Sequence, residues 1–159
     1  DVQLESAVYS PITTALLKDN AIFDYATKYY YSHQLTDWKS FKFGEAEFQD
    51  FLKFLKDNNF EYETETEKKF AEGLKTAEND DMSKDIANSY NQLMAAIDAA
   101  KDKAIVDKKI EIESLLMDEI LKRYFYREGL YNYQIEHNPE ILEAVAVLHD
   151  EGRYNKILK

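Results

Sequence analysis

Residues 103–137 read KAIVDKKIEIESLLMDEILKRYFYREGLYNYQIEH, and their apolar positions decide the fold. One stripe comprises Ile105, Ile112, Leu116, Ile120 and Tyr124, and a second comprises Ile110, Met117, Leu121, Phe125 and Leu130. Steps of three, four and seven residues are typical of a helix rather than a strand. The stretch contains no proline, and its first glycine is Gly129. A continuous helix at about 1.5 Å per residue would be roughly 50 Å long, so we expect shorter helices to pack along it.

The composition agrees with a helical fold. A chain of 159 residues is large enough to bury a core in a single domain without a disulfide or a metal, and it contains no cysteine. Its four glycines and two prolines are too few for the many tight turns of a sandwich or a barrel. The sequence therefore predicts an all-α protein.

The net charge, the length of the apolar runs and the first residues of the chain indicate which classes of protein it can belong to. There are 31 acidic and 20 basic side chains, and the resulting net charge of -11 disfavours a nucleic acid as partner. No apolar run approaches the roughly 18 residues of a membrane span. The chain starts at Asp1 rather than at a methionine, and Val2 and Leu4 alternate with polar residues as in a strand. We expect a piece of a longer protein whose preceding domain ends near this point.

Caps and periodicity place the other helices. Ser10-Pro11 is a helix start, because serine caps well and proline is favoured at the first helical position. We predict helices over about 11–19 and 21–33, then over 44–58, 64–79, 86–97 and 138–152, besides the long one over about 103–137. Residues 33–43 lose the helical period and form a loop that buries aromatic side chains. The predicted architecture is an irregular bundle of about seven helices packed along the long helix.

The chain carries no motif for catalysis or for a cofactor. The acidic segment 57–68 has Tyr62 where a calcium loop requires glycine, and Lys68 where it requires a bidentate glutamate. The three histidines, His33, His137 and His149, share no metal-binding spacing, so polar surface roles are the default. No serine or lysine lies in a nucleophile motif. We predict no catalytic residue, no metal and no cofactor in this chain.

Aromatic residues are the unusual feature of the composition. There are 12 tyrosines and 9 phenylalanines, with clusters at residues 29–31 and 124–126. Neighbouring positions on a helix are about 100° apart, so consecutive tyrosines cannot all face one core. They are either packing residues whose hydroxyls reach water or part of an interface. The candidate docking surface comprises Tyr29, Tyr30, Tyr31 and Trp38, on or beside the first helical hairpin, about Ser10 to His33.

Four segments resemble a known family. They are SPIT at residues 10–13, IFDYATKY at 22–29, RYFYREG at 123–129 and YNKIL at 154–158. Together they are similar to the region that follows the protease core in the carboxy-terminal processing (tail-specific) serine peptidases of Bacteroidetes-like bacteria. Asp1-Val2 looks like the end of the segment that follows the core sheet. By this resemblance, residues 1–9 trail an absent core, and residues 10–159 form one helical C-terminal domain.

The resemblance implies a function for the parent rather than for this piece. In the family, a serine nucleophile and a lysine base lie in the core, and a PDZ domain reads the C-termini of protein substrates; neither catalytic motif has a counterpart here. The implied role is a non-catalytic accessory domain of a periplasmic or envelope-associated endopeptidase. It would dock on the core and PDZ domain of the same chain, position substrate or contact a second subunit in a homo-oligomer. The alternatives are a free-standing helical interaction module and a metalloenzyme built as a helical bundle.

Overall fold

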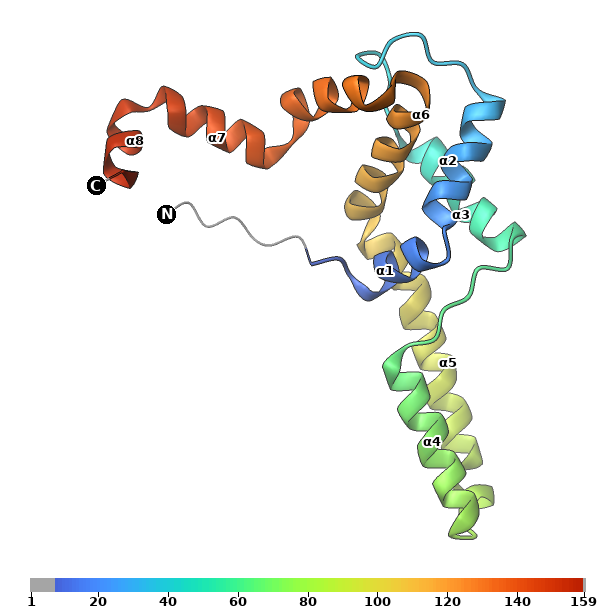
Figure 1. The fold of residues 1–159 in the computed structure, drawn as a ribbon. Coiled ribbons are helices and arrows are strands. Elements are labelled where there is room, and N and C mark those ends of the chain that lie inside the picture. The colour runs from blue at the N-terminus through green and yellow to red at the C-terminus, as the bar shows by residue number, and fades with distance from the viewer. Residues whose placement is uncertain (1–7, 159) are drawn as a thin grey trace.

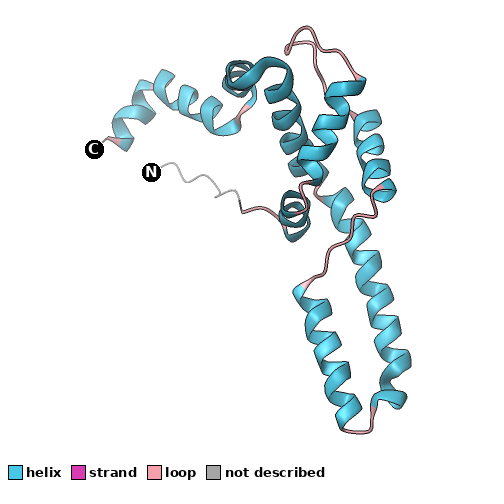
Figure 2. Ribbon diagram, turned by 45° about the vertical axis from the view of Figure 1, so that its right-hand side comes forward, coloured by secondary structure: helices cyan, strands magenta, loops and turns pink. Residues whose placement is uncertain are grey.

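The computed structural model describes residues 8–158 and consists of helices joined by turns and loops (Figure 1, Figure 2). The helices are α1 (Pro11–Lys18), α2 (Ala21–Ser32), α3 (Glu45–Asp57), α4 (Glu65–Asn79), α5 (Ser83–Asp107), α6 (Lys109–His137), α7 (Pro139–His149) and α8 (Glu151–Ile157). Residues 8–158 form no strand, so the all-α prediction is confirmed. None of these helices combines the length and apolarity needed to cross a membrane. The strand-like Val2 and Leu4 lie outside the described residues.

The start of α1 is fixed as the sequence predicts. The Ser10 hydroxyl accepts a hydrogen bond from the Thr13 amide at 3.3 Å, and Pro11 occupies the first turn. The Ser10 amide donates to Oε1 of Glu111 at 2.9 Å, which fastens the start of α1 to α6. Asn20 then turns the chain into α2 with a left-handed backbone at φ 61°.

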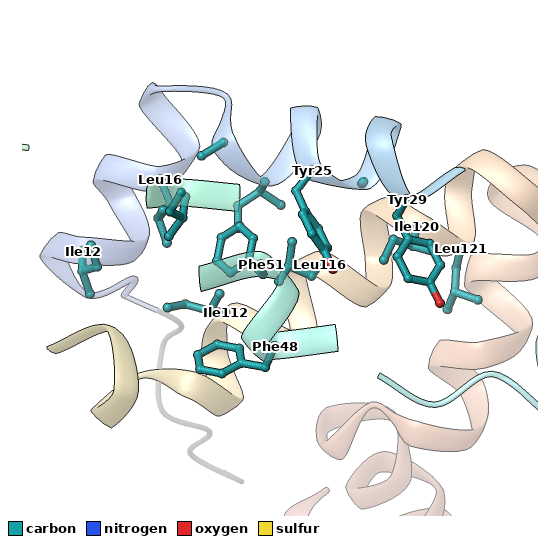
Figure 3. Packing of buried hydrophobic residues seen from close by; sticks show 14 of the residues in the cluster. Ile12, Leu16, Tyr25, Tyr29, Phe48, Phe51, Ile112, Leu116, Ile120 and Leu121 are labelled. Carbon is teal, nitrogen blue, oxygen red and sulfur yellow. The ribbon is translucent and has the colours of Figure 1, made fainter. Parts of the chain in front are cut away.

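The core lies where α1, α2, α3 and the first part of α6 meet. Figure 3 shows apolar side chains from these helices pointing toward one another. The buried cluster comprises Ile12, Leu16, Ala21, Ile22, Tyr25, Ala26, Tyr29, Phe41, Phe48, Phe51, Leu55, Ile112, Leu116, Ile120 and Leu121. The first predicted stripe is therefore the face that α6 turns toward α2. The loop between α2 and α3 buries Phe41, as expected for that aromatic segment.

The predicted single helix over 103–137 is wrong in two places. Residues 103–107 belong to α5, and the helix is interrupted at Lys108, where φ is -100° and ψ is 17°. A second break occurs inside α6 at Tyr126, with φ 56° and ψ -161°. A side chain other than glycine rarely adopts this conformation, and the strain amounts to about 1–3 kcal/mol.

Contacts across the break at Tyr126 show how sharply α6 bends. The Tyr133 hydroxyl donates to Sδ of Met117 at 3.5 Å, and Nε2 of Gln134 lies 3.3 Å from Oδ2 of Asp118. Residues 16 positions apart in a straight helix would be about 24 Å apart. The part of α6 after Tyr126 therefore turns sharply away from the axis of the first part, and side chains reach across the bend (Figure 1).

Two projections leave the core. The α4–α5 hairpin extends downward in Figure 1, and the arm formed by α7 and α8 extends to the left. No described side chain of α5, α7 or α8 is buried. Helix α8 was not predicted, because Gly152 was expected to end a helix. The Asp150 carboxylate instead accepts from the Arg153 amide at 3.0 Å and starts a new one.

The base of the hairpin is closed by a capping box and an ion pair. Thr64 and Glu67 cap each other, with Thr64 Oγ1 accepting from the Glu67 amide at 3.1 Å. Lys101 on α5 donates to Oε1 of Glu67 at 2.8 Å. Although burial opposes the charge, the bond from Lys101 dominates and lowers the pKa of Glu67 to about 2 from 4.5. Glu67 thus stabilises the fold in its ionised form.

We expect Glu67→Gln to lower the free energy of unfolding at pH 7 by about 1–2 kcal/mol. The substitution weakens the cap and leaves Lys101 with only the more distant carboxylate of Asp98, at 3.7 Å. Because the folded pKa lies below the ordinary one, this stabilisation is complete above about pH 5 and is lost as the pH falls toward 2. Urea titrations between pH 7 and 3 measure it. The matched control is Glu65→Gln in the same turn, whose carboxylate is exposed. Equal losses in both variants would contradict the assignment.

Candidate interaction surface

The three consecutive tyrosines of α2 point in different directions, as helical geometry requires. Tyr29 is buried, whereas 41% of Tyr30 and 82% of Tyr31 are exposed. The Tyr29 ring stacks on His33 with centroids 3.9 Å apart and also contacts Phe41 at 6.0 Å. Burial raises the pKa of the Tyr29 hydroxyl, so it remains a neutral phenol. Tyr29 is therefore a core residue.

Trp38 also packs within the chain. Its ring meets Tyr133 edge-on at 6.4 Å, and the Lys39 ammonium lies 5.2 Å from its centroid. Tyr133 belongs to the part of α6 that follows the bend, so Trp38 fastens the α2–α3 loop to that segment. The four predicted docking residues therefore do not form one surface, and only Tyr30 and Tyr31 face outward among them.

The exposed tyrosines join other side chains in an aromatic surface. We define it as Phe23, Tyr30, Tyr31, Arg123 and Tyr124, from α2 and α6. The Tyr30 ring lies 5.4 Å from Tyr31 and 4.8 Å from Tyr124. The Tyr124 hydroxyl donates toward the His33 carbonyl at 2.8 Å and the Tyr30 carbonyl at 3.1 Å, groups left free at the end of α2.

Arg123 completes the aromatic surface at its other end. Its guanidinium lies 4.3 Å from the centroid of Phe23, of which 56% is exposed. Nη2 donates to the Phe23 carbonyl at 2.9 Å, and Nη1 donates to the Glu119 carboxylate at 3.0 Å. With its head group held from three sides, Arg123 loses little further freedom when a partner binds. Tyrosine and arginine are the residue types that dominate binding energy at protein interfaces.

The polar side chains of the described region form no catalytic group. Ser32 Oγ lies 2.9 Å from Nδ1 of His33, but the serine hydroxyl also donates to the Lys28 carbonyl at 2.9 Å and caps the end of α2. His137 stacks on Tyr133, and His149 is exposed. Residues 8–158 contain no cluster of three side chains able to hold a metal ion.

Sequence reasoning missed Phe23, Arg123 and Tyr124 as members of the surface. Arg123 and Tyr124 lie about 100 residues away from Phe23 in sequence. The sequence feature that could have pointed to this surface is the aromatic cluster at residues 124–126. Nothing in the sequence shows that this cluster lies beside residues 29–31.

Comparison with known proteins identifies a family for most of the chain. Residues 12–148 match the family model described as "Probable PDZ-protease, C-terminal helical domain". Neither the curated proteins nor the solved structures contain a match. The matched range spans α1 to α7 and includes every residue of the aromatic surface.

Proposed function

Because the chain belongs to the family of C-terminal helical domains of probable PDZ-proteases, we propose that it is the non-catalytic accessory domain of a carboxy-terminal processing serine peptidase, and that it docks on the protease core through the aromatic surface. The observation that supports this role is the cluster of exposed aromatic rings around a fixed arginine. Tyr31 contacts Tyr30 but leaves 82% of its side chain exposed, as expected for a tyrosine at an interface.

The remaining parts of the proposal rest on the resemblance of the sequence to the tail-specific peptidases. The serine and lysine that cleave the substrate would lie in the core, outside this chain. A PDZ domain of the same protein would present the C-terminus of the substrate. The parent would work in the periplasm or attached to the cell envelope. The helical domain contributes by holding the core and PDZ domain in a productive arrangement.

The test compares the intact peptidase with the helical domain alone. We expect Tyr31→Ser to lower the activity or melting temperature of the intact peptidase, since it removes an aromatic side chain from a docked interface. The melting temperature of the isolated chain should hardly change, because Tyr31 is mostly exposed there.

Tyr131→Ser is the matched control, because Tyr131 is a tyrosine of α6 with 55% exposure outside the aromatic surface. An effect of Tyr31→Ser that is equal in the intact peptidase and the isolated chain would assign Tyr31 to internal packing. No effect in either protein would also refute docking through this surface. If the gene encoding the chain contains no protease core, the chain is a free-standing interaction module.

A further inference from the structure

Two residues at the bend in α6 favour opposite conformations of the helix. Tyr126 has φ 56° and ψ -161°, a backbone conformation that glycine adopts far more easily, and its side chain is 79% exposed, so little packing offsets the strain. Gly129 permits the bend, because a Cβ at this position would overlap Cβ of Phe125. In a continuous helix the Cβ atoms of residues four apart are about 5–6 Å from each other, so a larger residue would fit at position 129. Tyr126 therefore favours a continuous helix, whereas Gly129 favours the bend.

The polar contacts that hold the segment after the bend are weak ones. The Tyr133 hydroxyl lies 3.5 Å from Sδ of Met117, and Nε2 of Gln134 lies 3.3 Å from Oδ2 of Asp118. The amide–carboxylate distance is beyond the usual range for such a bond. Leu130 is buried and adds an apolar contact. The arm formed by α7 and α8 follows this segment and extends away from the core in both Figure 1 and Figure 2, so a change at the bend would reorient the arm.

Asp118 is the charged group at the contact across the bend, and it is partly buried there. The titratable groups around this contact are Lys122 and Glu119 on the same segment, Tyr133, Glu136 and His137 after the bend, and Lys39 in the α2–α3 loop. Burial raises the pKa of the Asp118 carboxyl above its ordinary value of 3.8, although Lys122 and the amide of Gln134 act in the opposite direction. The bent form therefore accommodates protonated Asp118 better than ionised Asp118.

We propose that α6 is a two-state switch at Tyr126, in which ionisation of Asp118 favours a continuous helix and its protonation favours the bend, so that the arm changes direction with pH. The continuous form relieves the backbone of Tyr126 and exposes the Asp118 carboxylate to water, whereas the bent form buries Leu130. Since a carboxyl in water titrates near pH 4 and Asp118 in the bent form titrates higher, the bent fraction is greatest below about pH 4 and falls as the pH rises through the higher pKa. The aromatic surface lies before the bend, so the switch is independent of docking through it.

Distance measurements across the bend test the proposal. The chain contains no cysteine, so Ser114→Cys and Ile135→Cys place one nitroxide label on each side of the bend, at two exposed positions of α6. A continuous helix would separate these positions by about 31 Å, and the bent form brings them closer. We expect pulsed electron paramagnetic resonance of the whole chain to show both distances, with the shorter one gaining as the pH is lowered from about 7.5 to about 4. Trp38 is the only tryptophan and packs on Tyr133, so its fluorescence follows the same change without labels.

Asp118→Asn tests whether this carboxyl controls the switch. Asparagine keeps the size of the side chain and its capacity to bond Gln134 but carries no charge, so the shorter distance should dominate at every pH. The matched control is Glu113→Gln on the same helix, because Glu113 pairs with Lys109 before the bend. His137→Gln removes the histidine nearest the contact. Both of these variants should keep the response of the wild type to pH, and a response that survives in Asp118→Asn or disappears in His137→Gln would overturn the assignment to Asp118.

Two further variants test the balance at a single pH. Tyr126→Gly should shift the distances toward the bent form, because glycine adopts the backbone of the bend more easily and a continuous helix less easily than tyrosine. Gly129→Ala should shift them toward the continuous form, and circular dichroism verifies that both variants remain helical. A single distance in the wild type at every pH, or shifts of the same sign in these two variants, would overturn the proposal. Tyr31→Ser should leave the distances unchanged, which separates this test from that of the proposed function.

Discussion

Leu116→Ala is expected to lower the free energy of unfolding by about 2–5 kcal/mol, through the lost transfer of the side chain from water and the cavity left behind. Leu116 is completely buried and lies one helical turn from each of the buried residues Ile112 and Ile120. The helices around Leu116 come from three different parts of the chain. Movement of a single loop therefore cannot fill the cavity that the shorter side chain leaves. A urea or guanidinium titration, followed by circular dichroism, measures the change.

The control for this prediction is Ile110→Ala on the same helix. Ile110 belongs to the second predicted stripe, but it is 84% exposed, so the free energy of unfolding should change by less than about 0.5 kcal/mol. An unchanged denaturation midpoint for Leu116→Ala, or equal shifts for both variants, would mean that a different face of α6 packs on α2.

The comparison of these two positions shows how far the sequence specifies the fold. Apolar periodicity predicts that residues 105–130 are helical, and the regular stripe through Leu116 is the buried one. The second stripe is mixed, with Leu121 buried and Ile110 exposed. Periodicity gives the direction of side chains around a helix, but burial depends on which neighbours lie there. Those neighbours come from α1, α2 and α3, far away in sequence.

The two interruptions of the predicted long helix have a similar explanation. Neither Lys108 nor Tyr126 is a residue that breaks helices by its own chemistry. The break at Lys108 lies where α5, paired with α4, meets α6, which packs on α2. At Tyr126 the strained backbone is held by contacts on both sides of the bend, including that of Tyr133 with Met117. Such breaks follow from tertiary packing, which a local pattern does not contain.

The candidate site was predicted only in part for the same reason. Helical geometry requires the three tyrosines of α2 to diverge, and it does not say which one is buried. Tyr29 is the buried one, since α2 turns Tyr25 and Ala26 toward α6 as well. Trp38 lies in a loop whose partner, Tyr133, follows the bend in α6. Without that bend Trp38 has no predictable neighbour, and its place in a docking surface stays a prediction.

Gly129→Ala should lower the free energy of unfolding by about 2–4 kcal/mol, the size expected when a close contact has to be relieved by moving the backbone. A Cβ on Gly129 would overlap Cβ of Phe125, the residue just before the bend. Since Phe125 Cβ is fixed to the helix backbone, a change of rotamer cannot remove the overlap. The segment after Tyr126 would have to move away from the segment before it.

Gly73→Ala is the matched control, because the same added methyl meets open space on α4. It should raise the free energy of unfolding by up to about 1 kcal/mol, as expected for alanine replacing glycine in a helix. The two substitutions therefore have opposite signs. Thermal or urea unfolding of both variants measures the difference, and the fluorescence of Trp38 adds a local readout, since the movement of α6 in Gly129→Ala displaces Tyr133 from its ring. If alanine at residue 129 were as well tolerated as alanine at residue 73, the close approach of Gly129 to Phe125 would not be what shapes the bend.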